Sequence, residues 1–220
     1  MSNVRIDWYF DFISPFAYLQ LRRMLSPPAG IEVRFQPVLF AGILDRVGQL
    51  GPAEIPSKRR FTYRHVVWRA RREGIALRFP PAHPFNSLRM LRLAIAAGST
   101  AEVVQALFEY AWRDGRLPDD EQAWTAFVTA AGLQAADART AEAEVKQQLR
   151  ANTDSAIAAG VFGVPSCVVD GEVFWGSDVT DMVFEYCRNP GLLEDPEMQR
   201  VAHLPVGAAR PRSTKQGGSG

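Results

Sequence analysis

The sequence has few of the residues that build disulfide frameworks and metal sites. Among 220 residues it has only two cysteines, Cys167 and Cys187, and three histidines. Neither the cysteine spacing nor any pair of histidines matches a zinc site. Cys167 also lies in an apolar run, where cysteine usually acts as a small hydrophobe. We therefore expect neither a disulfide scaffold nor a metalloenzyme.

An excess of charge of one sign and a long hydrophobic run are also missing. The 25 basic and 24 acidic residues give a formal net charge of +1, which gives no reason to expect nucleic acid or an anionic membrane as partner. No apolar run reaches the roughly 18 residues of a membrane span. Asp7 and Asp11 interrupt the apolar N-terminal stretch, which has no cleavage site for export. We expect a cytoplasmic protein that binds neither nucleic acid nor membrane.

The stretch from Ile6 to Tyr18 organises the rest of the chain. Its first residues are β-branched and aromatic, as in a buried strand, and apolar residues recur at helical spacing from Phe16 onward. Ser14 is a favoured N-cap, and Pro15 is favoured at the first helical position. Ser14 either only caps this helix or also presents its hydroxyl at the positive helix end, where anions, including thiolates, are stabilised.

The remaining pattern predicts a mixed α/β chain. A second strand is expected over 31–38, and an Asp170-Gly171 turn joins two strands at 166–169 and 173–175. A last helix follows over 179–187. Between the second and third strands we expect helices over residues 57–73, 88–97, 100–114, 120–131 and 139–159. The first of these is strongly basic, and we interpret most of its arginines as a solvated face.

This β-α-β…β-β-α order resembles the thioredoxin fold, split by a long all-helical insertion. In that fold the first helix starts beside a cis-proline loop that precedes the third strand, and Ser14 and Val164-Pro165 occupy these places. Where thioredoxin-like oxidoreductases have Cys-x-x-Cys, this chain has Ser14-Pro15-Phe16-Ala17. Dithiol exchange is thus excluded at this position. A hydroxyl there can still donate to a sulfur supplied from outside, as in a glutathione-using enzyme.

The resemblance implies a division of the chain into three parts. Residues 1–39 and 160–206 form the thioredoxin-like domain, and residues 40–159 form the helical insertion domain. Residues 207–220, rich in Ala, Arg, Pro, Gly and Ser, are expected to be a flexible tail.

Three motifs sharpen the resemblance when taken together: the segments 10–18, 162–166 and 175–178. They are similar to the branch of the DsbA-type superfamily that holds kappa-class glutathione transferases and 2-hydroxychromene-2-carboxylate isomerases. The Phe-Ile-Ser-Pro-Phe start and the Trp-Gly-Ser-Asp ending look closer to the isomerases. Those enzymes interconvert 2-hydroxychromene-2-carboxylate and trans-o-hydroxybenzylidenepyruvate in bacterial aromatic degradation.

The resemblance also implies a role for each matching residue. Ser14 would stabilise the glutathione thiolate as the catalytic residue, and Val164 with Pro165 would pair with the glutathione backbone. Ser177 and Asp178 would hold the γ-glutamyl end. Asp178 has the alternative interpretation of a simple helix cap.

Three further residues match family positions near the cofactor or the substrate. Lys58 would bind a carboxylate of glutathione or of the substrate, while Asn86 and Phe12 would contact the substrate. Lys58 has the alternative of a solvated side chain, and Asn86 that of an N-cap. The segment 80–85 departs from the isomerase pattern, and we expect it to line the substrate pocket.

The resulting hypothesis is a glutathione-dependent isomerase of an aromatic keto acid, acting by reversible thiolate addition. The resemblance also leads us to expect a homodimer. A kappa-like glutathione transferase is the first alternative, because the same site would serve both reactions. A non-catalytic thioredoxin-like binding module is the second, but it would not need the γ-glutamyl anchor at Ser177 and Asp178.

Overall fold

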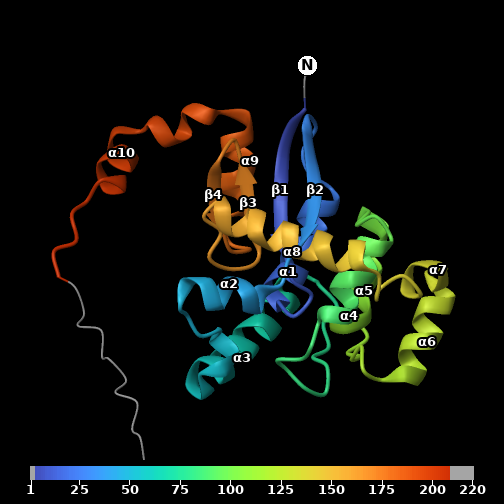
Figure 1. Cartoon of the computed structure of the whole chain (residues 1–220). Coiled ribbons are helices and arrows are strands. Elements are labelled where there is room, and N and C mark those ends of the chain that lie inside the picture. Colours follow the sequence, from blue (N-terminus) through green and yellow to red (C-terminus); the bar gives the residue numbers. More distant parts are fainter. Residues whose placement is uncertain (1–2, 209–220) are drawn as a thin grey trace, which may run out of the picture.

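The computed structural model describes residues 3–208, and its centre is a four-stranded sheet with the order β2-β1-β3-β4 (Figure 1). β1 (Val4–Phe10) pairs in parallel with β2 (Ile31–Pro37). β3 (Ser166–Val169) runs antiparallel to β1, and β4 (Glu172–Trp175) antiparallel to β3. Strands from the two ends of the chain thus lie side by side at its centre.

Two helices complete this unit. α1 (Pro15–Leu25) connects β1 to β2, and α9 (Thr180–Arg188) follows β4. The turn between β3 and β4 has positive φ at both central residues, 49° at Asp170 and 89° at Gly171, as a two-residue hairpin requires. The predicted thioredoxin-like order is therefore present, and the fold is a mixed α/β fold with a four-stranded sheet and many helices.

The chain between β2 and β3 is helical, as its sequence pattern predicts. Its α-helices are α2 (Phe40–Val47), α3 (Pro56–Arg72), α4 (Leu88–Ala96), α5 (Ala101–Trp112), α6 (Glu121–Ala130), α7 (Gln134–Asp137) and α8 (Ala143–Ala158). A short 3₁₀ turn at Pro52–Glu54 lies between α2 and α3. α8 lies across the sheet in Figure 1, while α2 and α3 lie at the end of the sheet where α1 begins. None of the helices in residues 3–208 has the length and apolarity to cross a membrane.

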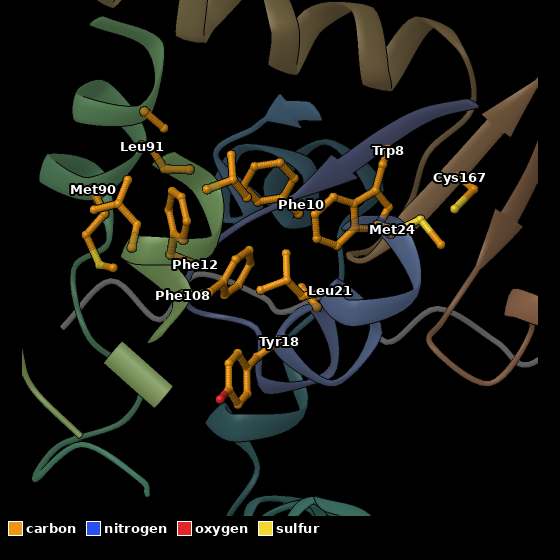
Figure 2. Close-up of a cluster of buried hydrophobic side chains, with 14 of the residues drawn as sticks. Trp8, Phe10, Phe12, Tyr18, Leu21, Met24, Met90, Leu91, Phe108 and Cys167 are labelled. Carbon is orange, nitrogen blue, oxygen red and sulfur yellow. The ribbon is translucent and has the colours of Figure 1, made fainter. Parts of the chain in front are cut away.

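One aromatic core joins the sheet to the inserted helices (Figure 2). Trp8 stacks on Phe10 with ring centroids 4.6 Å apart, and Phe12 contacts Phe108 of α5 at 4.7 Å. All four rings are fully buried. Because these contacts cross the boundary between the sheet and the insertion, the inserted helices pack directly against the strand that leads to Ser14.

The structure differs from the sequence-based prediction in a few elements. The helix predicted from residue 139 begins at Ala143, after the short α7. A 3₁₀ turn at Pro190–Glu194 and a helix α10 at Pro196–Ala202 were not predicted. Asp195 caps α10 by accepting from the Glu197 and Met198 N–H groups, so the Asp-Pro start was a usable signal. The predicted tail lies almost wholly outside the described residues.

Candidate active site

The loop between β1 and α1 is held by a buried carboxylate. Asp11 is 1% exposed. It accepts from the Ile13 N–H (3.1 Å), from the Phe40 N–H (3.0 Å) and from the Ser87 hydroxyl (2.5 Å). Burial raises the pKa of the Asp11 carboxyl, and these three donors oppose the rise. Asp11 thereby ties the loop to the first residue of α2 and to the residue before α4.

Ser14 follows this loop and caps α1. Its Oγ accepts from the Ala17 N–H and donates to the Val164 carbonyl, with 3.3 Å between the heavy atoms in each case. Both distances exceed the usual hydrogen-bond range, so the hydroxyl is only weakly held by these partners. Ser14 is 6% exposed, and it lies at the positive end of α1.

The Val164-Pro165 loop lies against Ser14, and its peptide bond is cis. The Pro165 carbonyl accepts from the Gly176 N–H at 2.9 Å, which connects this loop to the end of β4. Gly163 lies close to the Trp175 ring, since a Cβ atom there would come within 2.5 Å of Trp175 Nε1 unless the ring moved. Val164 itself is 7% exposed. The first and second predicted motifs thus meet directly, and the second contacts the third.

A buried glutamine on α1 holds the third motif in place. Gln20 accepts from the Trp8 indole N–H at 2.7 Å and donates to Thr180 Oγ1 at 2.9 Å and to the Gly176 carbonyl at 3.3 Å. Thr180 in turn donates to the Ser177 carbonyl at 2.8 Å. Gln20 lies six residues beyond Ser14, which is about 9 Å along a helix. The Ser177 loop therefore lies against the same helix that begins beside Ser14.

Arg69 of α3 completes this end of the site. It donates to the Ser177 hydroxyl at 2.6 Å and pairs with Glu73 at 2.9 Å. With Asp178, Ser177 and Arg23 it lines a cavity of about 270 Å³ beside α1. The cavity is therefore lined by positively charged guanidinium groups and by negatively charged carboxylates. This lining suits a ligand that carries both a carboxylate and an ammonium group.

The sequence analysis missed Arg69 because it treated most arginines of this helix as solvated. A signal was present, however. Arg69 lies three residues after Val66 and next to Ala70, and these two are the buried residues of α3. Residues three apart share a helix face, so Arg69 was placed at the inner edge of the helix.

His83 is a second residue that the sequence analysis did not single out. Its Nε2 lies 2.8 Å from the carbonyl oxygen of Ile13, the residue before Ser14. Its Nδ1 lies 2.7 Å from the Tyr63 hydroxyl. Burial lowers the pKa of His83, and the hydrogen bond with Ile13 opposes this. The prediction that segment 80–85 lines the substrate pocket stays a prediction, and no feature of the sequence pattern distinguished His83.

The predicted residues of the cofactor site fall into two groups. Ser14, Val164 and Pro165 form one group, and Ser177 and Asp178 form the other, with Gly176 between them. Asp178 is exposed and is not the cap of α9, because the N-cap is Val179 and no side chain caps it. The alternative of a simple helix cap for Asp178 is thereby removed.

The three residues predicted to contact the substrate lie in different surroundings. The prediction for Phe12 is wrong, because its side chain is 0% exposed and is enclosed by Phe10, Phe108 and α4 in the core (Figure 2). Asn86 is exposed and accepts from the Leu88 N–H at 3.0 Å, but it is not the N-cap of α4, which is Ser87. Lys58 is exposed at the start of α3 and lines a second, open hollow with Phe61. The substrate roles of Asn86 and Lys58 stay predictions.

The protein's own thiols and histidines do not form a reactive centre here. Cys167 and Cys187 are both free and buried, and burial raises the pKa of each thiol. Within residues 3–208, no group of three or more His, Cys, Asp or Glu side chains has the arrangement to hold a metal ion.

The fold and the site define the class of the protein. Residues 5–187 match the family model of the DSBA-like thioredoxin domain, so the chain belongs to that family.

Among its relatives in this family are isomerases. The chain is 31% identical over 192 residues to the 2-hydroxychromene-2-carboxylate isomerase of Pseudomonas putida, a match that covers 79% of this chain and 89% of that protein. It is 25% identical over 217 residues to glutathione S-transferase kappa 2 of Caenorhabditis elegans, which covers 84% and 92%. A solved 2-hydroxychromene-2-carboxylate isomerase superposes with a TM-score of 0.75 at 26% identity, over 88% of this chain and 98% of that one. The chain thus belongs to the 2-hydroxychromene-2-carboxylate isomerase family within the DsbA-like proteins.

Proposed function

We propose that the protein is a glutathione-dependent isomerase of 2-hydroxychromene-2-carboxylate or a related aromatic keto acid. The observation that carries the proposal is the continuous connection from Ser14 through Val164 and Gly176 to Ser177. It joins a hydroxyl at a helix N-terminus to a charged cavity beside the same helix.

The chain's residues fit glutathione at both ends of this groove. Arg69 and the Ser177 N–H would hold the γ-glutamyl carboxylate, and Asp178 would pair with its ammonium group. Val164 would pair with the cysteinyl backbone beside the cis-proline, in the manner of an added strand. The charged cavity supports this assignment because its guanidinium and carboxylate groups match the two charges of an amino-acid head group.

Ser14 carries out the chemical role of the site in this proposal. When bound, glutathione supplies a thiolate that adds reversibly to the conjugated double bond of the substrate, so that the bond can rotate. Ser14 Oγ would turn its weakly held proton from Val164 toward the sulfur, and the α1 N-terminus would add its positive potential. A free thiol has a pKa of about 8.5, and such surroundings bring a thiol toward neutrality.

A glutathione transferase is the second candidate, and the kappa-class relative favours it. The groove described above would serve either reaction, because the two differ in the electrophile and in whether sulfur leaves again. The binding-module alternative is disfavoured, because a general peptide groove does not require paired charges beside Ser177.

The test combines binding and turnover. Calorimetry is expected to show micromolar to millimolar binding of glutathione, and 2-hydroxychromene-2-carboxylate is expected to isomerise only when glutathione is present. Conjugation of a model electrophile without isomerisation would favour the transferase. No binding of glutathione would contradict both enzymes.

Two further expectations accompany the proposal. Reduced glutathione is the abundant thiol of reducing compartments, so the proposed cofactor suits a cytoplasmic enzyme with a small-molecule substrate. The homodimer stays a prediction, and the sedimentation behaviour of the purified chain would test it.

A further inference from the structure

His83 connects the inserted helices to the residue that precedes Ser14. Its ring lies in the segment between α3 and α4, seventy positions along the chain from Ile13. Nε2 is 2.8 Å from the Ile13 carbonyl oxygen, and Nδ1 is 2.7 Å from the Tyr63 hydroxyl. Both ring nitrogens therefore have a partner, one on each side of the ring.

These partners favour one neutral form of the imidazole. A carbonyl oxygen only accepts, so Nε2 must carry the proton that bonds to Ile13. In the neutral ring Nδ1 is then an acceptor, and the single proton of the Tyr63 hydroxyl is shared between Nδ1 and the His83 carbonyl. The same hydroxyl lies 2.7 Å from the His83 carbonyl, so Tyr63 holds both the ring and the backbone of His83.

The surroundings of the ring stabilise this neutral form and restrict the position of the imidazole. Tyr63, Phe79, Phe85 and Trp112 surround it, with ring centroids between 5.2 and 6.1 Å from that of the imidazole. Burial in this aromatic enclosure disfavours the charged ring and lowers the pKa of His83. Because the imidazole is neutral and enclosed on several sides, its Nε2 proton points at the Ile13 carbonyl oxygen.

The Ile13 carbonyl belongs to the peptide that orients Ser14. Other side chains also bond to the backbone of Ile13 and of the residue before it. Asp11 accepts from the Ile13 N–H, and the Trp112 indole N–H donates to the Phe12 carbonyl at 2.8 Å. His83 supplies the last of these restraints, directly before the N-cap. Its hydrogen bond and the donation from the Ser14 N–H to the Asp11 carbonyl at 3.0 Å hold the two sides of the Ile13-Ser14 peptide, from which the Ser14 side chain extends.

We propose that His83, held by Tyr63, is a positioning residue that directs the Ser14 hydroxyl toward the sulfur of the bound cofactor. The proposal rests on the proposed function. His83 does not touch the sulfur in it. It acts through the Ile13 carbonyl, so its loss should change the efficiency of Ser14 more than the affinity for glutathione.

The experiment compares four variants with the wild type. His83→Phe keeps a ring in the enclosure but removes the donor to Ile13, whereas His83→Gln keeps an N–H donor at a similar reach. Tyr63→Phe removes only the hydroxyl that favours this tautomer. Tyr110→Phe is the matched control, because it also removes a tyrosine hydroxyl bonded to a backbone carbonyl, that of Leu117 at 2.8 Å, within the inserted helices.

The measurements are kcat, KM for glutathione and the pH dependence of bound-thiolate absorbance. Misplacement of a catalytic group by about 1 Å can cost roughly a hundredfold, so His83→Phe should lower kcat by about ten- to a hundredfold, with KM nearly unchanged and the thiol pKa raised. His83→Gln should recover most of the loss. Tyr63→Phe should fall between wild type and His83→Phe, and Tyr110→Phe should match the wild type.

Nitrogen-15 spectra of the histidine rings add a readout that needs no cofactor. With only three histidines in the chain, the His83 signals are assigned by their loss in His83→Gln. The wild-type ring should carry its proton on Nε2, and Tyr63→Phe should weaken this preference. A proton on Nδ1 in the wild type would overturn the proposal, whether or not His83→Phe folds.

The outcomes separate this proposal from the proposed function. Failure of the wild type to bind glutathione would overturn the proposed function, and with it any role of His83 toward a cofactor. Normal glutathione binding and turnover by the wild type, together with an unchanged kcat and thiol pKa in His83→Phe, would overturn the role of His83 alone.

Discussion

The two ends of the proposed glutathione groove are built in different ways. At the sulfur end, Ser14 and Val164 are buried, and their contact is a neutral hydrogen bond of 3.3 Å. At the glutamyl end, Arg69 and Asp178 bring opposite charges to an open cavity, and Arg69 donates to Ser177 at 2.6 Å. Charge-assisted hydrogen bonds are roughly twice as strong as neutral ones, whereas a hydroxyl stabilises a developing charge only when it is aimed at it. We expect the glutamyl end to control affinity and the sulfur end to control reactivity.

The largest expected effect comes from Ser14→Ala, which removes the hydroxyl from the sulfur end. A hydrogen bond to a charged group contributes about 1.5–3 kcal/mol, so the bound thiol pKa should rise by roughly one to two units. Turnover near neutral pH should fall about ten- to a hundredfold and partly recover at higher pH, with glutathione affinity little changed. The pH dependence of thiolate absorbance measures this directly.

Thr100→Ala is the matched control for Ser14→Ala. Thr100 caps α5 and accepts from the Val103 N–H at 3.4 Å. The Thr100→Ala variant therefore loses a similar capping hydrogen bond at a place away from the groove. Both variants should lose about 1 kcal/mol of unfolding free energy or less, and only Ser14→Ala should lose activity. An unaltered thiol pKa in Ser14→Ala would mean that Ser14 is only a cap.

Arg69→Met tests the other end of the comparison. Removal of a donor to a carboxylate at this partly exposed site should cost about 1.4 kcal/mol, or a tenfold weaker affinity for glutathione. The value of kcat at saturating glutathione should stay close to that of the wild type. Calorimetry and steady-state kinetics separate the two effects.

Arg72→Met provides the control on the same helix, because Arg72 lies over the exposed Trp68 ring, 5.3 Å from its centroid. Its glutathione affinity should not change. If Arg69→Met instead lowered kcat and left affinity intact, the division of roles between the two ends would be wrong.

Gly163→Ala is expected to have a smaller effect, on stability. The new Cβ would lie 2.5 Å from Trp175 Nε1, but Trp175 is 52% exposed and its ring can move outward. We therefore expect a loss of about 1 kcal/mol of unfolding free energy, the low end for overpacking. Gly42→Ala, whose Cβ would make an ordinary 3.5 Å contact with Thr153, should show no such loss in urea denaturation.

The smallest effect is expected from the protein's own thiols. Burial raises the pKa of Cys167 and Cys187, and thiolates are the reactive species. A chromogenic disulfide reagent should therefore react with neither cysteine until the protein is unfolded, and insulin disulfides should not be reduced. Insulin reduction that is lost in Cys167→Ala would show that a protein thiol, not an external one, serves the site.

Local pattern predicted much of the fold. The strand and helix that flank Ser14, the Asp170-Gly171 turn and the helical nature of the insertion all follow from alternation, helical spacing and caps. Within the candidate site, local pattern indicated Ser14 as a helix N-cap, whereas Val164, Pro165, Ser177 and Asp178 came from the resemblance to a known family. The error at Phe12 arose because a matching family position does not show which way a side chain turns, and here it turns into the core.

The sequence by itself determined which helices, strands and turns form, because these depend on neighbouring residues. Only the tertiary structure decided the partners of Arg69 and His83. Arg69 meets Ser177 across 108 positions, and His83 meets Ile13 across 70. An arginine on a basic helix and a histidine between prolines have no local signature of such partners. Their roles arise from burial and from hydrogen bonds to distant backbone and hydroxyl groups, which exist only once the inserted helices have packed against the sheet.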